Sequence, residues 1–189
     1  MKSLIDDIIR YEPWNGKEAA EKELILDFLR ANSDALDRSN QAGHMTASAW
    51  VVNPERTKVL MAYHKIYDSW AWLGGHADGC ADLLKVAIKE ACEEAGLQRE
   101  GVRPMSREIL SLEVLPVEGH MKKGKWVPSH LHYNLTYLLE VAENEALAVN
   151  EEENSSVAWF TFEEALAASK EPWFVEHIYS KLIKKTENK

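Results

Sequence analysis

The sequence predicts an α+β fold, because helical and strand patterns follow one another along the 189 residues without internal repeats. Three observations support this prediction. Apolar residues recur at helical spacing near the N-terminus, a hairpin pattern begins near residue 43, and residues 130–137 alternate between two kinds of side chain. The length suits one domain with an N-terminal appendage, and the 46% hydrophobic fraction suits a packed core.

Two helices are expected before the main domain. Residues 1–12 and 17–31 each carry apolar side chains at helical spacing, and Pro13 interrupts the pattern between them. We expect these helices to pack on the main domain or on a partner subunit. The predicted division is an N-terminal helical extension over residues 1–39 and a main domain over residues 40–189.

The main domain reads as a series of strands with one central helix and a helical end. The order of hairpin, short strand, helix, long strands and final helices fits an α+β fold without further assumptions. The expected strands cover residues 44–53, 58–65, 67–75, 108–121, 126–141 and 157–161. One expected helix follows the polar loop after Gly75 and stops at Gly96, a second begins at the capping-box signature Thr161-Phe162-Glu163-Glu164, and the last covers residues 173–185.

The stretch from Gly74 to Leu97, GGHADGCADLLKVAIKEACEEAGL, is a glycine turn and a polar loop followed by a helix. Glu90, Glu93 and Glu94 fall within an arc of roughly 100° on that helix, because each residue advances about 100°. Like charges four residues apart cost a helix about 0.2–0.5 kcal/mol, and a bound cation would offset this cost. The alternative is a solvated acidic face that binds nothing.

This stretch resembles the Nudix box, G-x5-E-x7-R-E-U-x-E-E-x-G-U, in which U is aliphatic. Gly75 takes the first position, and KEACEEAGL, residues 89–97, follows in register. Ala81 stands in place of the first Glu, and Lys89 stands in place of the Arg. The resemblance extends more loosely over most of residues 40–189. It implies an α/β/α sandwich, with a mixed and partly antiparallel sheet flanked by helices.

The resemblance also implies a chemistry, which is the metal-assisted attack of water on a diphosphate linkage in a nucleoside diphosphate derivative. Mg²⁺ prefers oxygen ligands, and Mn²⁺ is a second candidate. Glu90, Glu93 and Glu94 match the metal-binding carboxylates of the family, and Glu90 also matches a base discussed in some members. Lys89 matches the arginine that orients a neighbouring Glu, and Gly75 matches the loop glycine.

The missing carboxylate at Ala81 opens a second interpretation. A methyl group neither binds metal nor accepts a proton, so the domain could be catalytically weakened and bind a nucleotide or a protein partner. Asp78 or Asp82 could substitute in part, although neither is in register. An acidic loop over residues 151–153 could supply the base, and Glu153 is our candidate there. A solvated acidic loop is the alternative.

Other candidate substrate contacts lie in the glycine turn and on a strand. Gly74 and Gly75 are expected near the substrate, and His130 and His132 share one strand face. This His pair could bind a metal, but no third His or Cys stands at a recognisable spacing, so hydrogen bonding to substrate is favoured. Lys65 and several aromatic residues could also contact the substrate, although a surface lysine and core aromatic residues are the alternatives: Tyr63, Tyr67, Trp70, Trp72 and Trp126.

Composition limits the classes of partner. The net charge of -9 argues against a general nucleic-acid surface, and no apolar run approaches the roughly 20 residues that span a bilayer. The start lacks a signal-peptide layout, and Cys80 and Cys92 lack CxxC spacing, so a reduced, cytoplasmic protein is expected. An isoprenoid diphosphate isomerase, a third interpretation, would need a strand cysteine outside the box. Dimerisation is common on this fold, and the N-terminal helices could serve a homodimer.

Overall fold

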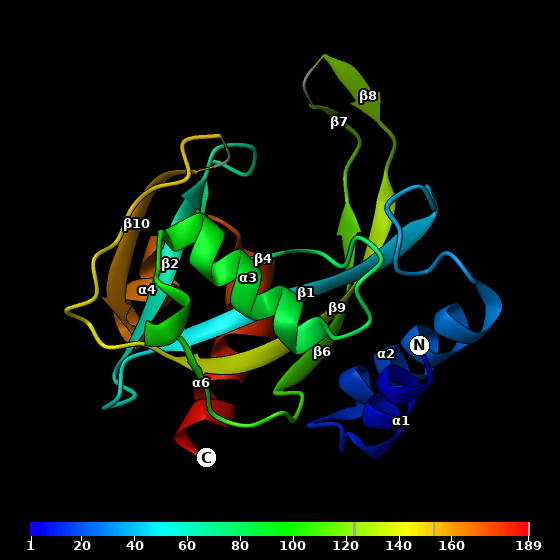
Figure 1. The fold of residues 1–189 in the computed structure, drawn as a ribbon, viewed down its shortest axis with the longest axis horizontal. Coiled ribbons are helices and arrows are strands. Elements are labelled where there is room, and N and C mark those ends of the chain that lie inside the picture. Colours follow the sequence, from blue (N-terminus) through cyan, green and yellow to red (C-terminus); the bar gives the residue numbers. More distant parts are fainter. Residues whose placement is uncertain (123, 153, 189) are drawn as a thin grey trace.

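The structure is a computed structural model that describes residues 1–122, 124–152 and 154–188. Its described residues form an eight-stranded sheet and a separate two-stranded arm, which projects from the body in Figure 1. The sheet comprises β1 (Gly43–Val52), β2 (Lys58–His64), β3 (Ser69–Ala71), β4 (Leu73–His76), β5 (Arg103–Pro104), β6 (Ser111–Val117), β9 (His130–Glu140) and β10 (Asn154–Thr161), and the arm comprises β7 (His120–Lys122) and β8 (Lys125–Val127).

The helices lie at both ends of the chain and once in its middle. They are α1 (Lys2–Arg10), α2 (Gly16–Ala31), α3 (Leu83–Ala95), a short 3-10 helix (Arg99–Gly101), α4 (Phe162–Ala168), α5 (Pro172–Phe174), a π-helical turn (Val175–Tyr179) and α6 (Ser180–Glu187). None of the helices in the described part of the chain has the length and apolar character needed to span a bilayer.

The sheet is mixed, as expected. Strands β1 and β9 pair in parallel along their whole length, whereas β1 pairs antiparallel with β2 and β4. The predicted hairpin between β1 and β2 is confirmed. The single strand expected over residues 67–75 is wrong, because β3 pairs with β2 and β4 pairs with β1. The chain changes its partner strand between them, which sets the glycine turn against β1.

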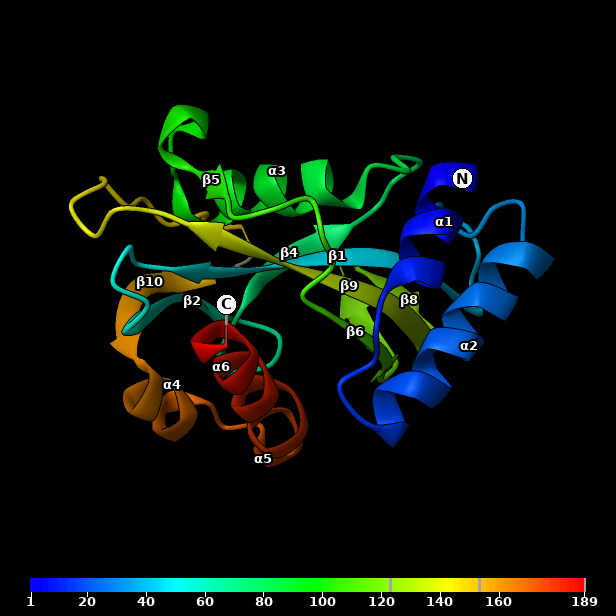
Figure 2. The ribbon, with the colours of Figure 1, turned by 90° about the horizontal axis from the view of Figure 1, so that it is seen from below.

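The sheet lies between two helical layers. Figure 2 shows α3 on one face and α4, α5 and α6 on the other. Side chains alternate along β1, so Ala49 and Val51 join the core cluster that contains α3 residues, while Trp50 and Val52 join the cluster of the C-terminal helices. This arrangement is the α/β/α sandwich that the sequence predicts.

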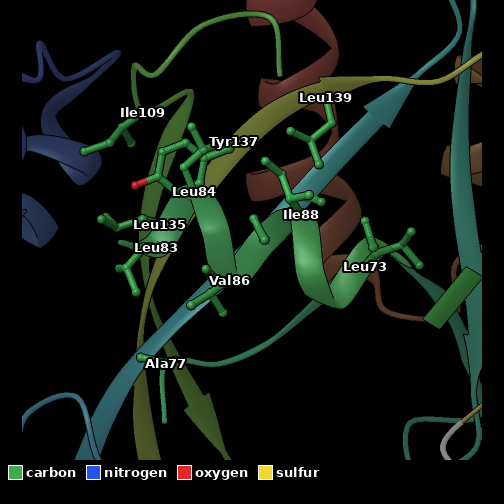
Figure 3. Close-up of a cluster of buried hydrophobic side chains, with 14 of the residues drawn as sticks. Leu73, Ala77, Leu83, Leu84, Val86, Ile88, Ile109, Leu135, Tyr137 and Leu139 are labelled. Carbon is green, nitrogen blue, oxygen red and sulfur yellow. The ribbon is translucent and has the colours of Figure 1, made fainter. Parts of the chain in front are cut away.

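Helix α3 is held by its caps and by its apolar side. The Asp82 side chain accepts the Lys85 backbone N–H at its start, and Gly96 ends it with a left-handed φ of 66°. Leu84 and Ile88 are buried against the sheet among the side chains of Figure 3. Burial of such a side chain stabilises the fold by about 1.5–3 kcal/mol. The acidic side of α3 is therefore fixed in orientation.

The N-terminal helices pack on the main domain, beside β6 in Figure 2. Both predicted helices are confirmed, and Ile8 and Ile25 are fully buried in the same cluster as α3. Polar contacts also tie them down, since Glu18 of α2 bonds to Lys181 and Lys185 of α6. The division into residues 1–39 and 40–189 stays a prediction.

One expectation for the second half of the chain needs correction, because the last helix contains a π-helical turn. The capping box is confirmed, because Thr161 and Glu164 exchange side-chain and backbone hydrogen bonds at the start of α4.

Candidate active site

The glycine strand β4 lies against the acidic side of α3. The Gly74 N–H donates to Oε2 of Glu94 at 2.8 Å, and Nδ2 of Asn154 lies 3.3 Å from the other carboxylate oxygen. A Cβ at Gly74 would lie 2.6 Å from the Ala47 carbonyl oxygen, so the close approach of β4 to β1 requires glycine. Glu94 is 4% exposed, and its orientation is fixed by these bonds.

Gly75 makes room for a second carboxylate. A Cβ at this position would lie 2.5 Å from Cδ of Glu90, which is far inside van der Waals contact. The side chain of Glu90 is 15% exposed, whereas that of Glu93 is 53% exposed. The three carboxylates thus form a graded series from Glu94 in the interior to Glu93 at the surface.

Lys89 bridges two of these carboxylates. Its Nζ lies 2.9 Å from Oε2 of Glu93 and 3.0 Å from Oε1 of Glu90. The hydrogen bonds to Glu93 and Glu90 raise the pKa of Lys89, so its ammonium group stays charged. Four side chains then carry three negative charges and one positive charge. Lys89 therefore contacts both Glu90 and Glu93. Its role in orienting a neighbouring Glu remains a prediction.

Most of the predicted site residues line a cleft of about 760 Å³. Its lining includes every described residue of that prediction: Gly74, Gly75, Lys89, Glu90, Glu93, Glu94, His130 and His132. Glu153, the predicted base, lies outside the described residues. Glu152 and Asn150 of the same loop line the cleft, so an acidic group from this loop does reach the site.

The two carboxylates that could compensate for Ala81 are already engaged. The Asp82 side chain caps α3 and contacts Arg107, and Asp78 forms a two-pronged ion pair with Arg38. The Arg38 hydrogen bond lowers the pKa of Asp78, which is therefore ionised. Asp78 lines the cleft, but as the partner of an arginine. Substitution by Asp82 would require loss of a helix cap.

The floor of the cleft is a buried hydrogen-bond network centred on Asn134. Its Oδ1 accepts from Thr46 and Ser48 at 3.0 Å each, and its Nδ2 donates to Glu113 at 3.0 Å. These strand positions point to the cleft side of the sheet, as the alternation of β9 predicts. Satisfied networks of this kind hold neighbouring side chains in one arrangement.

Two further histidines, which were not predicted from the sequence, lie close to the predicted pair His130 and His132. His44 of β1 is opposite His132 in the register of β9, and His76 of β4 is opposite Thr46 of β1. The absence of a recognisable third ligand in the sequence was therefore misleading, because strand pairing sets this proximity. Burial lowers the pKa of His44, so its imidazole is neutral near pH 7.

Only some of the other candidate substrate contacts line the cleft. Lys65, Tyr67 and Trp72 line the cleft, although Lys65 donates to the Glu151 carbonyl oxygen. Trp126 is 64% exposed on the β7–β8 arm. Cys80 and Cys92 are free and lie in the loop before α3 and on α3, so neither supplies the strand cysteine of an isomerase.

A family model described as the NUDIX domain matches residues 43–182. The chain belongs to the Nudix family. The box that the sequence predicts is thus the glycine strand, loop and helix α3 described above. Among curated proteins, none matched the chain.

Solved structures share this Nudix fold. The chain is similar to a Nudix hydrolase from M. smegmatis, RenU (19% identity, TM-score 0.57, 77% of this chain and 88% of that chain). It is also similar to a C. elegans Ap4A hydrolase binary complex (17%, 0.54, 76% and 96%) and to a NUDIX family hydrolase from Clostridium perfringens (22%, 0.50, 77% and 97%). At these identities the likeness establishes the fold.

Proposed function

We propose that the protein is a divalent-metal-dependent hydrolase that cleaves the diphosphate linkage of a nucleoside diphosphate derivative. The observation that carries this proposal is the set of Glu90, Glu93 and Glu94 around the glycine strand at a large cleft. The similar structures include hydrolases, one of them an Ap4A hydrolase, which supports the same class of reaction.

The residues fit Mg²⁺ or Mn²⁺, because carboxylate oxygens beside an open cleft are the ligands such hard cations take. Glu90, Glu93 and Glu94 would hold the metal, and the four charged groups with Lys89 leave an excess of negative charge for it. When bound, such a metal polarises a phosphoryl oxygen and lowers the pKa of water.

The chain's own groups position the substrate and the proton acceptor. The Gly74 and Gly75 backbone would allow a substrate to come close, and the Lys89 ammonium group, which lines the same cleft, would stabilise negative charge that develops on phosphate oxygens. A base must accept the proton of the attacking water. Glu152 lines the cleft and is the described candidate, and Glu153 beside it remains our first proposal from the sequence.

The test is incubation of the full chain with Mg²⁺ and a panel of nucleoside diphosphate derivatives in ¹⁸O-labelled water. We expect release of a nucleoside monophosphate or phosphate product carrying one ¹⁸O atom at the attacked phosphorus. Omission of the metal should abolish release. Absence of turnover across the panel, together with measurable ligand binding, would favour a binding protein over an enzyme.

A second candidate is a catalytically weakened Nudix domain, and the surroundings of Ala81 favour it. The nearby carboxylates of Asp78 and Asp82 are held by Arg38 and by the start of α3. Ala81→Glu restores the missing carboxylate. If the site is weakened at this position, the variant should raise kcat, with Ala81→Gln as the uncharged control. An unchanged rate would show that the base lies elsewhere, in the loop over residues 150–153.

A further inference from the structure

Four histidines from three strands meet within the cleft. They are His44 of β1, His76 of β4, and His130 and His132 of β9. The ring centroid of His44 lies 4.9 Å from that of His130 and 5.0 Å from those of His76 and His132. Four imidazoles at this separation form a nitrogen-rich site in the same cleft as the carboxylates of α3.

We propose that His44, His130 and His132 bind a divalent transition metal of the Zn²⁺ class, with His76 beside it as a fourth nitrogen. One ligand nitrogen from each of the first three residues lies within 4.8 Å of the others. This site is separate from the carboxylates, and it stands whether or not the protein hydrolyses a diphosphate.

Hydrogen bonds at Nδ1 of His130 and His44 leave Nε2 of each ring as the nitrogen that can bind a metal. Nδ1 of His130 lies 2.8 Å from the Pro128 carbonyl oxygen, and Nδ1 of His44 lies 3.3 Å from the Asn40 carbonyl oxygen. A carbonyl only accepts, so each Nδ1 carries the proton and each Nε2 has a lone pair, which in His130 faces Nε2 of His132. A backbone carbonyl on the second nitrogen is the usual support of a metal-binding histidine.

The burial of His44 also supports a metal site. The residue is 5% exposed, and its Nε2 has no hydrogen-bond partner within the part of the chain that the structure describes. A buried acceptor nitrogen is normally paired. The strand register explains its position, because His44 sits directly opposite His132 in the parallel pair of β1 and β9.

The spacing of the nitrogens suits a small metal ion. Nε2 of His130 lies 3.2 Å from Nε2 of His132. Two nitrogens bound to one tetrahedral Zn²⁺ at about 2.0–2.1 Å stand roughly 3.3 Å apart. Small rotations of the side chains would bring the His44 nitrogen to the same ion. Three histidines with one open position form the arrangement of a site that accepts water or a substrate oxygen.

The two sites in the cleft differ in the metal they select. Imidazole nitrogens suit Zn²⁺, Co²⁺ and Ni²⁺, whereas carboxylate oxygens suit Mg²⁺ and Mn²⁺. His130 and His132 line the same cleft as Glu90 and Glu93, so the open position of the histidine site faces the same substrate space. An oxygen donor of a cleft ligand, such as a phosphate, is the class of group it would take.

Co²⁺ titration of the chelator-treated full chain, in excess Mg²⁺, tests this proposal. The visible ligand-field bands of Co²⁺ report nitrogen coordination. We expect one Co²⁺ per chain, displaced by Zn²⁺, and an affinity at least about tenfold weaker in the His130→Gln/His132→Gln double variant. His177→Gln, at a histidine of the π-helical turn outside the cleft lining, should leave the affinity unchanged, and so should Glu93→Gln.

NMR of the ¹⁵N-histidine-labelled wild-type chain provides a second readout, in which metal binding is observed on the unaltered site. Addition of Zn²⁺ should shift the Nε2 resonances of three histidines, assigned by single His→Gln substitutions, and leave His177 unaffected. The proposal is overturned if wild type binds neither Co²⁺ nor Zn²⁺, if the double variant keeps the wild-type affinity, or if other histidines shift instead.

Discussion

Glutamate and lysine side chains form two clusters in this molecule, which differ in burial and in charge balance. The first, the buried network, consists of Glu18, Glu113, Lys181 and Lys185, each less than a tenth exposed. Lys181 lies 3.1 Å from Glu18 and 3.0 Å from Glu113, and Lys185 lies 2.9 Å from Glu18. Two carboxylates therefore meet two ammonium groups.

The second, the box cluster, consists of Lys89, Glu90, Glu93 and Glu94 on α3. Lys89 bridges Glu90 and Glu93 at the open cleft, while Glu94 bonds to the Gly74 N–H and to Asn154, so the cluster holds three carboxylates and one ammonium group. The same residue types thus serve two ends. Balanced and buried charges join α2, β6 and α6, whereas we propose that the unbalanced charges at the cleft bind a cation from solution.

Lys181→Met tests the structural side of this comparison and should have the largest effect. It leaves Glu18 and Glu113 buried with less compensation, and loss of one partner of a buried pair costs about 3–5 kcal/mol. Urea denaturation should show this decrease in the free energy of unfolding. Lys58→Met removes the exposed partner of Glu143 and should leave the free energy of unfolding close to that of wild type. Equal effects of the two variants would contradict the assignment.

Glu93→Gln tests the functional side. The variant keeps the shape of the side chain but removes a charge from the box cluster, so we expect kcat to fall by about 10²–10³-fold. The thermal midpoint should remain close to wild type, because Glu93 is half exposed. Glu163→Gln, at an exposed position of α4, should leave kcat unchanged. A stable variant with full activity would remove Glu93 from the site.

Gly75→Ala separates geometry from charge within the box cluster. The added Cβ would meet the carboxylate end of Glu90, a flexible group that can move aside. We expect the fold to survive while the displaced carboxylate lowers kcat by about 10–10²-fold, the scale of a 1 Å misplacement. Gly16→Ala, where a Cβ meets nothing, is the matched control. Loss of folding without loss of specific activity would argue against this reading.

The stability that the buried network contributes should depend on pH, and this effect should be smaller than that of Lys181→Met. Burial would raise the pKa of Glu18, but Lys181, the Trp14 N–H and Lys185 lower it to about 2 from 4.5. A depressed pKa stabilises the fold above the unfolded value, and this contribution is lost as pH falls toward 2. Between about pH 6 and pH 3, the stability difference between wild type and Glu18→Gln should change by about 2 kcal/mol. A pH-independent difference would contradict the pKa.

Local patterns predicted much of the fold. The capping box at Thr161, the alternation of β9 and the glycine at position 96 each act within a few residues, and each takes the expected form. The split of residues 67–75 into β3 and β4 was missed, because two different partner strands decide it. The π-helical turn was also missed, because apolar residues at helical spacing predict a helix without specifying its hydrogen-bond pattern.

The site divides in the same way. The box carboxylates could be predicted because one helix carries all three, so their spacing in sequence fixes their spacing in space. His44 and His76 come from strands that only the sheet brings to His132, and the sequence holds no local sign of that pairing.

Calorimetric titration of the full chain with Mg²⁺, in the presence of a nonhydrolysable nucleoside diphosphate analogue, measures metal binding by the box cluster. Mg²⁺ selects the carboxylates over the histidines. We expect saturable Mg²⁺ binding in wild type, an affinity at least about tenfold weaker in Glu93→Gln, and wild-type affinity in Glu163→Gln. Equal Mg²⁺ affinity in wild type and Glu93→Gln would contradict this expectation.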